Sequence, residues 1–312
     1  MKSLIIKGIQ KYVEETNAKG FVIGISGGKD STVVAKLLVE AIGKDKVLGV
    51  MMPNGEQSDI EDSKRVCELL GIEYMTVKIE DVYESLINSI EYSDKDGSFN
   101  LISTGESILV SDKSKTNIPP RIRMTTLYAI AQSIGYRVAG TGNRSERYVG
   151  WFTKHGDGGF DYNPIAPLCC TEVIKLGDEL GLPYDLVHKT PSDGLTGKSD
   201  EDNLGFTYEQ LDNYILDGTS GDKEIDKKIE NLHNLGKHKL GGGYTSAMEI
   251  THMNDPVIDY YMPWVNELSK GKMEREVLIY LDNGVISRNP EICDFISSFD
   301  EPVTVFVKDL IG

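Results

Sequence analysis

The chain has 312 residues, of which 39% are hydrophobic and 26% charged, and its formal net charge is −16. Its four cysteines give no disulfide framework, its first residues do not resemble a signal peptide, and no apolar run is long enough to span a membrane, so a cytoplasmic protein is predicted. The negative charge argues against a nucleic-acid partner, because such proteins replace phosphate counterions with Lys and Arg.

Strand-like apolar runs alternate with helical periodicity through the first 140 residues. Strands are predicted over residues 21–25, 46–51, 74–79 and 136–139. Helices are predicted over residues 3–15, 31–42, 59–70 and 122–134. This alternation predicts an α/β fold, with a doubly wound, mostly parallel sheet and helices on both faces. Ligands of such sheets bind beyond the carboxyl ends of the strands.

The first predicted strand leads into a glycine-rich turn. Gly27 and Gly28 follow it, and a helix is predicted to start near Asp30. The free amides of such a turn and helix start form a phosphate site, although a turn without a ligand is the plain alternative. A Walker loop needs Ser or Thr directly after Gly-Lys, but Asp30 follows Lys29 here. The alternating glycines of the dinucleotide fingerprint are also absent. The string Ser26-Gly27-Gly28-Lys29-Asp30-Ser31 instead resembles the pyrophosphatase loop of the ATP-dependent adenylating superfamily, which splits ATP between the α and β phosphates.

Two polar stretches interrupt the pattern, at residues 93–115 and 192–205. Each is predicted to be a loop, either a mobile lid or a plain connection. Glycines 241–243 are predicted to form a hinge. This predicts a domain over residues 1–240 and an extension over residues 241–312. The extension is predicted to be a small β-α-β unit with strands at 276–281 and 303–307 and a helix at 290–299.

Several further motifs lie between the glycine turn and the extension. They are the segments 117–124 (NIPPRIRM), 140–146 (GTGNRSE), 150–161 (GWFTKHGDGGFD), 189–195 (KTPSDGL) and 238–239 (HK). Each segment alone is weak evidence for a family. In this order and at these separations, however, the segments closely resemble those of the ammonia-dependent NAD synthetases. With the glycine turn, the resemblance covers residues 1–240.

The resemblance implies a role for each of a set of residues. It implies ATP binding by Gly24, Ile25, Ser26, Gly27, Gly28, Lys29, Asp30, Ser31, Thr141 and Ser192. It implies deamido-NAD binding by Arg121, Lys154, Asp161, His238 and Lys239, with Asp30, Lys154 and Asp161 as catalytic residues. Asp30 and Glu146 would bind Mg²⁺, which prefers carboxylate oxygens and also takes phosphate oxygens. A homodimer is implied as well. Taken singly, each of Arg121, Arg123 and Arg144 is more typical of an ordinary surface cation.

The implied reaction is a ligation that consumes ATP as a cosubstrate. The nicotinate carboxylate of deamido-NAD attacks the α-phosphorus and releases pyrophosphate, and ammonia then displaces AMP to form NAD. Two alternatives stay open: another adenylating amidotransferase or sulfurtransferase of the same superfamily, and a nucleotide sensor without catalysis.

One position departs from the family pattern. After Leu168 the family usually has an aromatic residue and then a lysine that reaches ATP phosphate, whereas this chain has Cys169 and Cys170. A thiol cannot supply the fixed positive charge, and Lys175 or Lys29 is a candidate replacement. The cysteine pair is compatible with a sulfur carrier or with buried structural thiols.

Overall fold

A computed structural model describes residues 1–56, 60–91, 109–189, 199–240, 279–282 and 305–308. The chain divides into two compact units, Met1–Tyr244 and Thr245–Gly312. In the second unit β5 (Ile279–Asp282) and β6 (Val305–Lys308) pair in parallel, with Ile279 opposite Val305. These strands overlap the two predicted ones, whereas the predicted hinge at 241–243 and the predicted helix at 290–299 lie outside the described residues.

The first unit contains a parallel sheet with the strand order β3-β2-β1-β4. Its strands are β1 (Phe21–Gly24), β2 (Val47–Met51), β3 (Glu73–Thr76) and β4 (Arg137–Ala139). Phe21 lies opposite Val47 on one side and opposite Arg137 on the other. The α/β fold and the parallel sheet predicted from the sequence are therefore confirmed.

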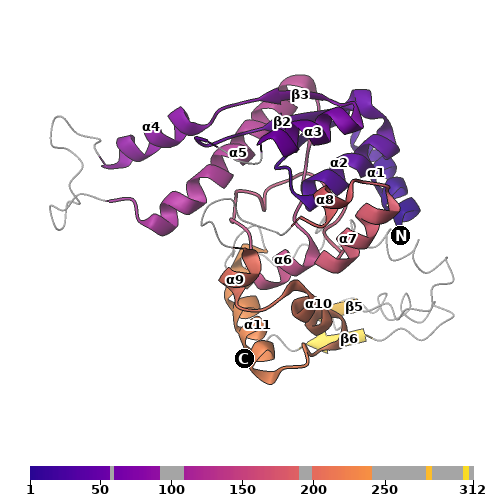
Figure 1. Ribbon diagram of the computed structural model, residues 1–312, viewed down its shortest axis with the longest axis vertical. Helices are drawn as coiled ribbons and strands as arrows, with labels where there is room; N and C mark the ends of the chain where they lie inside the picture. The colour runs from indigo at the N-terminus through magenta and orange to yellow at the C-terminus, as the bar shows by residue number, and fades with distance from the viewer. Residues whose placement is uncertain (57–59, 92–108, 190–198, 241–278, 283–304, 309–312) are drawn as a thin grey trace. The chain divides into compact units, whose positions relative to one another are not determined.

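Alternate residues of β1 point to opposite faces of the sheet, and helices cover both faces (Figure 1). Phe21 and Ile23 lie in one core with residues of the helices on that face. These helices are α1 (Lys2–Thr16), α2 (Lys29–Ile42), α3 (Ile60–Leu70), α7 (Cys170–Glu179) and α8 (Tyr184–Val187). Val22 lies in a second core with Leu127 and Ala131 of α5 (Asp112–Ile134).

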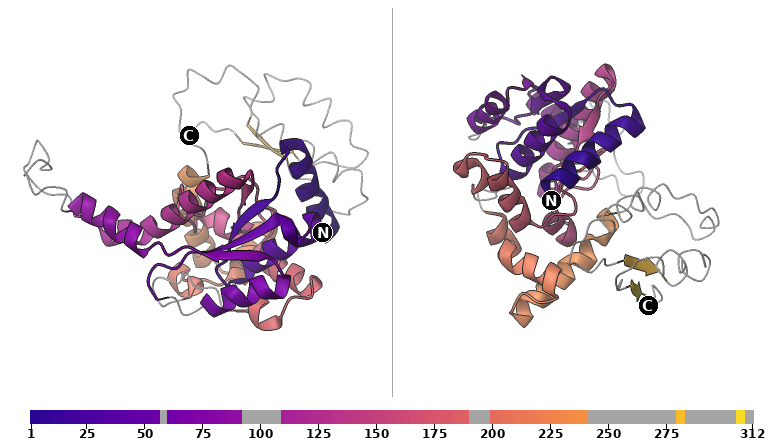
Figure 2. Two further views of the ribbon diagram at one scale, coloured as in Figure 1. Left: turned by 90° about the horizontal axis from the view of Figure 1, so that it is seen from above. Right: turned by 90° about the vertical axis from the view of Figure 1, so that its right-hand side faces the viewer.

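Helix α5 is longer than the sequence predicts, because it begins at Asp112 rather than at residue 122 and includes Pro119 and Pro120. Its start is fixed by Ser111, whose side chain accepts a hydrogen bond from the amide of Ser114. Helix α4 (Glu80–Glu91) was not predicted, although Val82, Leu86 and Ile90 have helical spacing. The two helices run side by side away from the sheet (Figure 2). None of the described helices is long and apolar enough to cross a lipid bilayer.

The remaining helices of this unit form a third core around Leu211 and Ile229. They are α6 (Arg144–Val149), α9 (Asp200–Leu204), α10 (Tyr208–Asp217) and α11 (Lys223–Gly236), and one-turn 3₁₀ helices lie at Lys44–Lys46 and Lys237–Lys239. Helix α9 corrects the prediction that 192–205 is entirely loop. Ser199 and Asp202 form a capping box at its start, which stabilises a helix too short to show periodicity.

Candidate nucleotide-binding site

The glycine-rich turn lies at the carboxyl edge of the sheet, between β1 and α2. The amide of Ile25 still donates to the carbonyl of Val50 at 3.0 Å, which holds the end of the strand in place. Gly27 then has a φ of +75°, a conformation that a residue with a side chain adopts only with strain. Gly28 is the N-cap of α2, so the turn delivers the chain directly into a helix.

Hydroxyl groups fix the shape of this turn. The amide of Gly28 donates to Ser26 Oγ at 3.2 Å, and Ser26 Oγ lies 3.1 Å from Ser31 Oγ. Thr32 Oγ1 donates to the carbonyl of Gly28 at 2.8 Å. The first amides of a helix have no acceptor within it, and the helix dipole adds partial positive charge there. The predicted residues Ser26 to Ser31 therefore surround a helix start of the kind that binds anions in other proteins, and Gly24 and Ile25 lie at the strand end before it.

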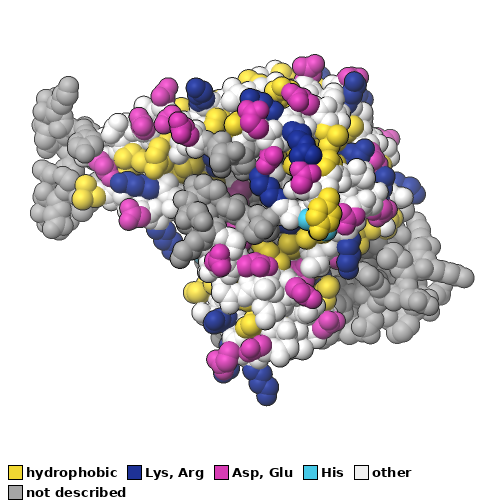
Figure 3. Space-filling view, viewed as in Figure 1, with side chains coloured by type: hydrophobic (Ala, Val, Ile, Leu, Met, Phe, Trp, Pro, Cys, Tyr) yellow, Lys and Arg dark blue, Asp and Glu magenta, His cyan; other side chains and the backbone are white. Residues whose placement is uncertain are grey.

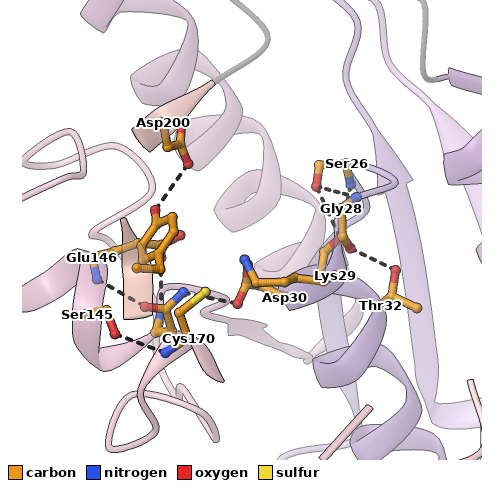
Figure 4. A network of polar contacts seen from close by, with 12 residues as sticks. Ser26, Gly28, Lys29, Asp30, Thr32, Ser145, Glu146, Cys170 and Asp200 are labelled. Carbon is orange, nitrogen blue, oxygen red and sulfur yellow. Dashed lines mark hydrogen bonds and ion pairs between the residues drawn. The ribbon is translucent and has the colours of Figure 1, made fainter. Parts of the chain in front are cut away.

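Two carboxylates from different helices meet beside the turn (Figure 4). Asn143 is fully buried; its Nδ2 donates to Asp30 Oδ1 at 3.1 Å, and its amide donates to Glu146 Oε2 at 3.0 Å. Burial and then the charge of Asp30 raise the pKa of Glu146, so a cation between these acids would lower their energy. The sequence did not identify Asn143 as a site residue, although it belongs to the GTGNRSE segment.

The donor set of Asp30 and Glu146 fits Mg²⁺ better than a metal enclosed entirely by protein. No cluster of three or more His, Cys, Asp or Glu side chains able to hold a metal ion occurs among the described residues. Mg²⁺ commonly binds one or two carboxylates, retains several waters and takes phosphate oxygens from a substrate. Two carboxylates held by Asn143 next to the glycine turn meet that requirement.

Lys29 and Tyr208 lie beside the acidic pair, Asp30 and Glu146. Lys29 Nζ lies 2.9 Å from Asp30 Oδ2 and 5.5 Å from the centre of the Tyr208 ring. Burial alone would lower the pKa of Lys29, but Asp30, Cys170 and Glu146 raise it above its usual value, so the ammonium is charged. Tyr208 comes from α10, outside every motif in the sequence, and its hydroxyl donates to Asp200 Oδ2 at 3.1 Å.

The paired cysteines begin α7, and both are buried and free of disulfides. The amide of Cys170 donates to Ser145 Oγ at 2.9 Å, and that hydroxyl donates to Asp212. Burial raises the pKa of each of the two thiols, Cys169 and Cys170, to about 12. Protonated, buried thiols are poor nucleophiles, which favours the structural interpretation over a sulfur carrier.

Three of the five residues implied for deamido-NAD are joined through two hydrogen bonds, and a fourth, Lys239, follows His238 in the chain. Arg121 Nε donates to the carbonyl of Lys154 at 3.3 Å, and Lys154 Nζ donates to the carbonyl of His238 at 2.7 Å. Lys239 Nζ donates to the carbonyls of Gly150 and Phe152 at 2.7 and 2.9 Å. These residues come from α5, from the segment after α6 and from the 3₁₀ helix Lys237–Lys239 that follows α11.

The fifth residue, Asp161, is held elsewhere. Its Oδ2 accepts from the amide of Val138 at 2.7 Å, and its Oδ1 accepts from the Tyr128 hydroxyl at 3.3 Å. Among the described residues, no hydrogen bond joins Asp161 to the other four. Thr141 follows β4 at the carboxyl edge, as expected, whereas Ser192 lies outside the described residues.

Asp157 is an acidic residue that the sequence analysis did not assign. Its Oδ1 accepts from the amide of Thr153 at 2.9 Å, and burial raises its pKa. The charge of Lys239 opposes that rise in the pKa of Asp157. Asp157 therefore orders the loop that carries Lys154, and its place in the GDGG turn was the available signal.

A glycine turn leading into a helix at the carboxyl edge of a parallel sheet, with two acids beside it, is typical of the α/β nucleotide-binding proteins. A protein-family model described as NAD synthase matches residues 2–241. The NH(3)-dependent NAD(+) synthetase of Pyrococcus horikoshii is 42% identical over 229 residues, which are 72% of this chain and 83% of that protein. The chain belongs to the NAD synthase family.

Solved structures agree with this assignment. The NMN synthetase from Francisella tularensis has a TM-score of 0.69 and 33% identity, covering 79% of this chain and 97% of that chain. The NH3-dependent NAD synthetase from Campylobacter jejuni has a TM-score of 0.60 and 25% identity, and the match covers 78% of this chain and 96% of that chain. The predicted family, fold and class of amide-forming ligase are confirmed. The predicted division into domains at residue 240 stays a prediction.

Proposed function

We propose that the chain converts deamido-NAD to NAD with ATP and ammonia, and that AMP and pyrophosphate are released. The observation that carries this proposal is the glycine turn between β1 and α2 with Asp30 and Glu146 beside it, in a chain of the NAD synthase family. The nicotinate carboxylate attacks the α-phosphorus, and the bond to pyrophosphate breaks. Ammonia then attacks the acyl carbon of the adenylate, loses a proton, and expels AMP.

The chain's own groups bind and orient the two anionic substrates. The amides at the start of α2 bind the phosphates that leave as pyrophosphate, so charge developing there meets donors already in place. Asp30 and Glu146 would hold Mg²⁺, which supplies charge neutralisation at phosphate oxygens when bound. Thr141 and Ser192 are proposed to contact ATP as well. Holding the two substrates in reacting geometry is the rest of the catalytic contribution.

The group formed by Arg121, Lys154, His238 and Lys239 is proposed to bind deamido-NAD. Arg121, Lys154 and His238 are joined by the contacts described above, and Lys239 follows His238 in the chain. The guanidinium and ammonium groups match the anionic phosphates and carboxylate of this substrate. Asp161 is proposed to bind a ribose hydroxyl or to order ammonia. Its bonds to Val138 and Tyr128 fix the carboxylate, so either role requires a ligand that reaches toward β4.

Purified protein supplied with ATP, Mg²⁺, ammonium and deamido-NAD is expected to form NAD and AMP in equal amounts. Chromatography of the nucleotides measures both products. Glutamine in place of ammonium serves as a control and is expected to yield no NAD, and a chelator is expected to stop the reaction. Formation of ADP instead of AMP, or nucleotide binding without pyrophosphate release, would contradict the proposal.

A second acceptor is favoured by one comparison. The solved structure with a TM-score of 0.69 is an NMN synthetase, so nicotinate mononucleotide is an alternative substrate for the same chemistry. The two acceptors are distinguished by supplying them together at equal concentration. Preferential formation of NAD supports the first proposal, and preferential formation of the mononucleotide amide supports the second.

The protein is also proposed to form a homodimer through α4, α5 and β3. Helix α4 has no buried side chain, and all four residues of β3 are exposed. Val82, Leu86 and Leu109 are 54%, 41% and 76% exposed, and hydrophobic side chains lie along this projecting part of the molecule (Figure 3). An apolar face of this extent marks an interface, and a second copy presents the same face.

Leu86→Glu is therefore expected to convert the dimer to a monomer, because it places a charge in the apolar face. Sedimentation equilibrium measures the mass against the 34.5 kDa of one chain. Leu216→Glu on α10 is the matched control, since Leu216 is 53% exposed but lies outside this face. A wild-type protein that sediments as a monomer would refute the proposed dimer.

A further inference from the structure

Asp212 is a buried acid that lies outside the acidic pair and outside every motif of the sequence. It comes from α10 and is 2% exposed. Burying a carboxylate is costly unless its oxygens accept hydrogen bonds. Here they accept from two other helices: the Ser145 hydroxyl of α6 donates to Oδ1, and the Thr171 amide of α7 donates to Oδ2 at 2.8 Å. One side chain therefore joins α6, α7 and α10.

The start of α7 takes its hydrogen-bond acceptors from α6 and α10. The first amides of a helix have no acceptor within it, and the N-cap residue, Cys169, offers only a thiol, which is a weak acceptor. The amide of Cys170 donates to Ser145 Oγ at 2.9 Å (Figure 4), and the amide of Thr171 donates to Asp212. The helix dipole also favours a negative charge at this end of α7. The starts of α6 and α7 are therefore tied together.

The start of α6 carries one member of the acidic pair. Ser145 is fully buried and directly precedes Glu146 in the chain. The carboxylate of Glu146 accepts from the amide of Asn143, the N-cap of α6, and the Asn143 side chain donates to Asp30. The separation of the two acids therefore depends on where the start of α6 lies. The Ser145 hydroxyl restrains that start, because it donates to α10 and accepts from α7.

We propose that Asp212 is a positioning residue for the acidic pair, and that it acts through the Ser145 hydroxyl to hold Glu146 beside Asp30. The role rests on the proposed metal-binding function of the two acids, and it involves no contact between Asp212 and a substrate. A carboxamide cannot replace the carboxylate, because two donors point at it. If the amide oxygen accepts from Thr171, the NH₂ group faces Ser145, and the Ser145 hydroxyl hydrogen has to turn away.

Titration of the full chain with Mn²⁺ tests this role, because Mn²⁺ takes the same carboxylate ligands as Mg²⁺ and its free form is measured by electron paramagnetic resonance. Glu146→Gln identifies the part of the binding that belongs to the acidic pair. Asp212→Asn is expected to weaken that part by about 10-fold, as is typical when a group that orients a metal ligand is lost. Unchanged Mn²⁺ affinity in Asp212→Asn, or a wild type without Glu146-dependent binding, would overturn the proposal.

Asp226→Asn is the matched control for this titration. Asp226 Oδ1 accepts from the hydroxyl and the amide of Ser220 at 2.5 and 2.7 Å, so the same substitution again removes a carboxylate that holds a serine. Asp226 lies in the first turn of α11 and holds the segment before that helix rather than the start of α6. Its variant is expected to bind Mn²⁺ with wild-type affinity, and a loss equal to that of Asp212→Asn would count against a specific role for Asp212.

The double variant Asp212→Asn/Ser145→Ala separates positioning through Ser145 from a general loss of stability. Both changes remove the same hydrogen bond, so the two losses of Mn²⁺ affinity are not expected to multiply. Losses that multiply would overturn the proposal, because Asp212 would then act independently of Ser145. If Asp212→Asn does not fold, Ser145→Ala decides alone, and wild-type Mn²⁺ affinity in that variant overturns the proposal. A chain whose Mn²⁺ affinity depends on Asp212 but which forms no NAD would refute the proposed reaction and leave this role standing.

Discussion

Asp30→Ala is expected to lower NAD formation by at least about 100-fold, because it removes one of the two carboxylates proposed to hold Mg²⁺ beside the leaving phosphates. Asp30 lies at the start of α2, where Asn143 and Lys29 both contact it. Its loss also leaves the Lys29 ammonium buried without its nearest partner, which destabilises the fold. The remaining core of the first unit does not depend on Asp30, so the variant is expected to stay folded.

Asp30→Asn is the companion variant, because the amide oxygen still accepts from Asn143 while the charge is gone. Both variants are expected to lose turnover, with circular dichroism close to that of wild type. Asp178→Ala is the matched control, since Asp178 pairs with His188 at the surface and lies outside the cluster. Near-normal turnover in Asp30→Asn would refute the assignment of Asp30 as a metal ligand.

Gly150→Ala is expected to reduce the free energy of unfolding by about 2–4 kcal/mol. The alanine would have to adopt a left-handed backbone conformation, and its Cβ would also clash with a neighbouring backbone. Gly150 ends α6 with a φ of +68°, and a Cβ there would lie 2.8 Å from the Cα of Gly236. Gly236 closes α11, so two backbones meet where neither can carry a side chain. Separating them would displace Lys239, whose ammonium binds the carbonyl of Gly150.

Urea unfolding measures the loss, and the KM for deamido-NAD is expected to rise in the same variant. Gly218→Ala provides the control, because Gly218 has a φ of +82° but nothing within 4 Å of the added Cβ. It is expected to cost about 1 kcal/mol, the backbone strain alone. Equal losses in the two variants would mean that the close approach of α6 and α11 does not matter for stability.

Local sequence patterns were sufficient to predict those elements whose interacting residues are near one another in the sequence. The apolar run at Phe21, the glycine turn and the helix after it are read from adjacent residues, and the structure places them as predicted. Helix α4 was missed although Val82, Leu86 and Ile90 have helical spacing, and none of its side chains is buried in the described structure. Helix α9 was missed because five residues are too few for periodicity.

The amino-acid sequence by itself determined the family, the parallel sheet and the glycine turn after β1, since each depends on residue types at short, fixed spacing. Only the tertiary structure decided that Lys29 is buried against Tyr208, because these residues come from helices far apart in the chain. The same holds for the hydrogen bonds that join Asp161 to Val138 and Tyr128. Contacts over such distances follow from how the helices pack on the sheet, and packing has no local signature.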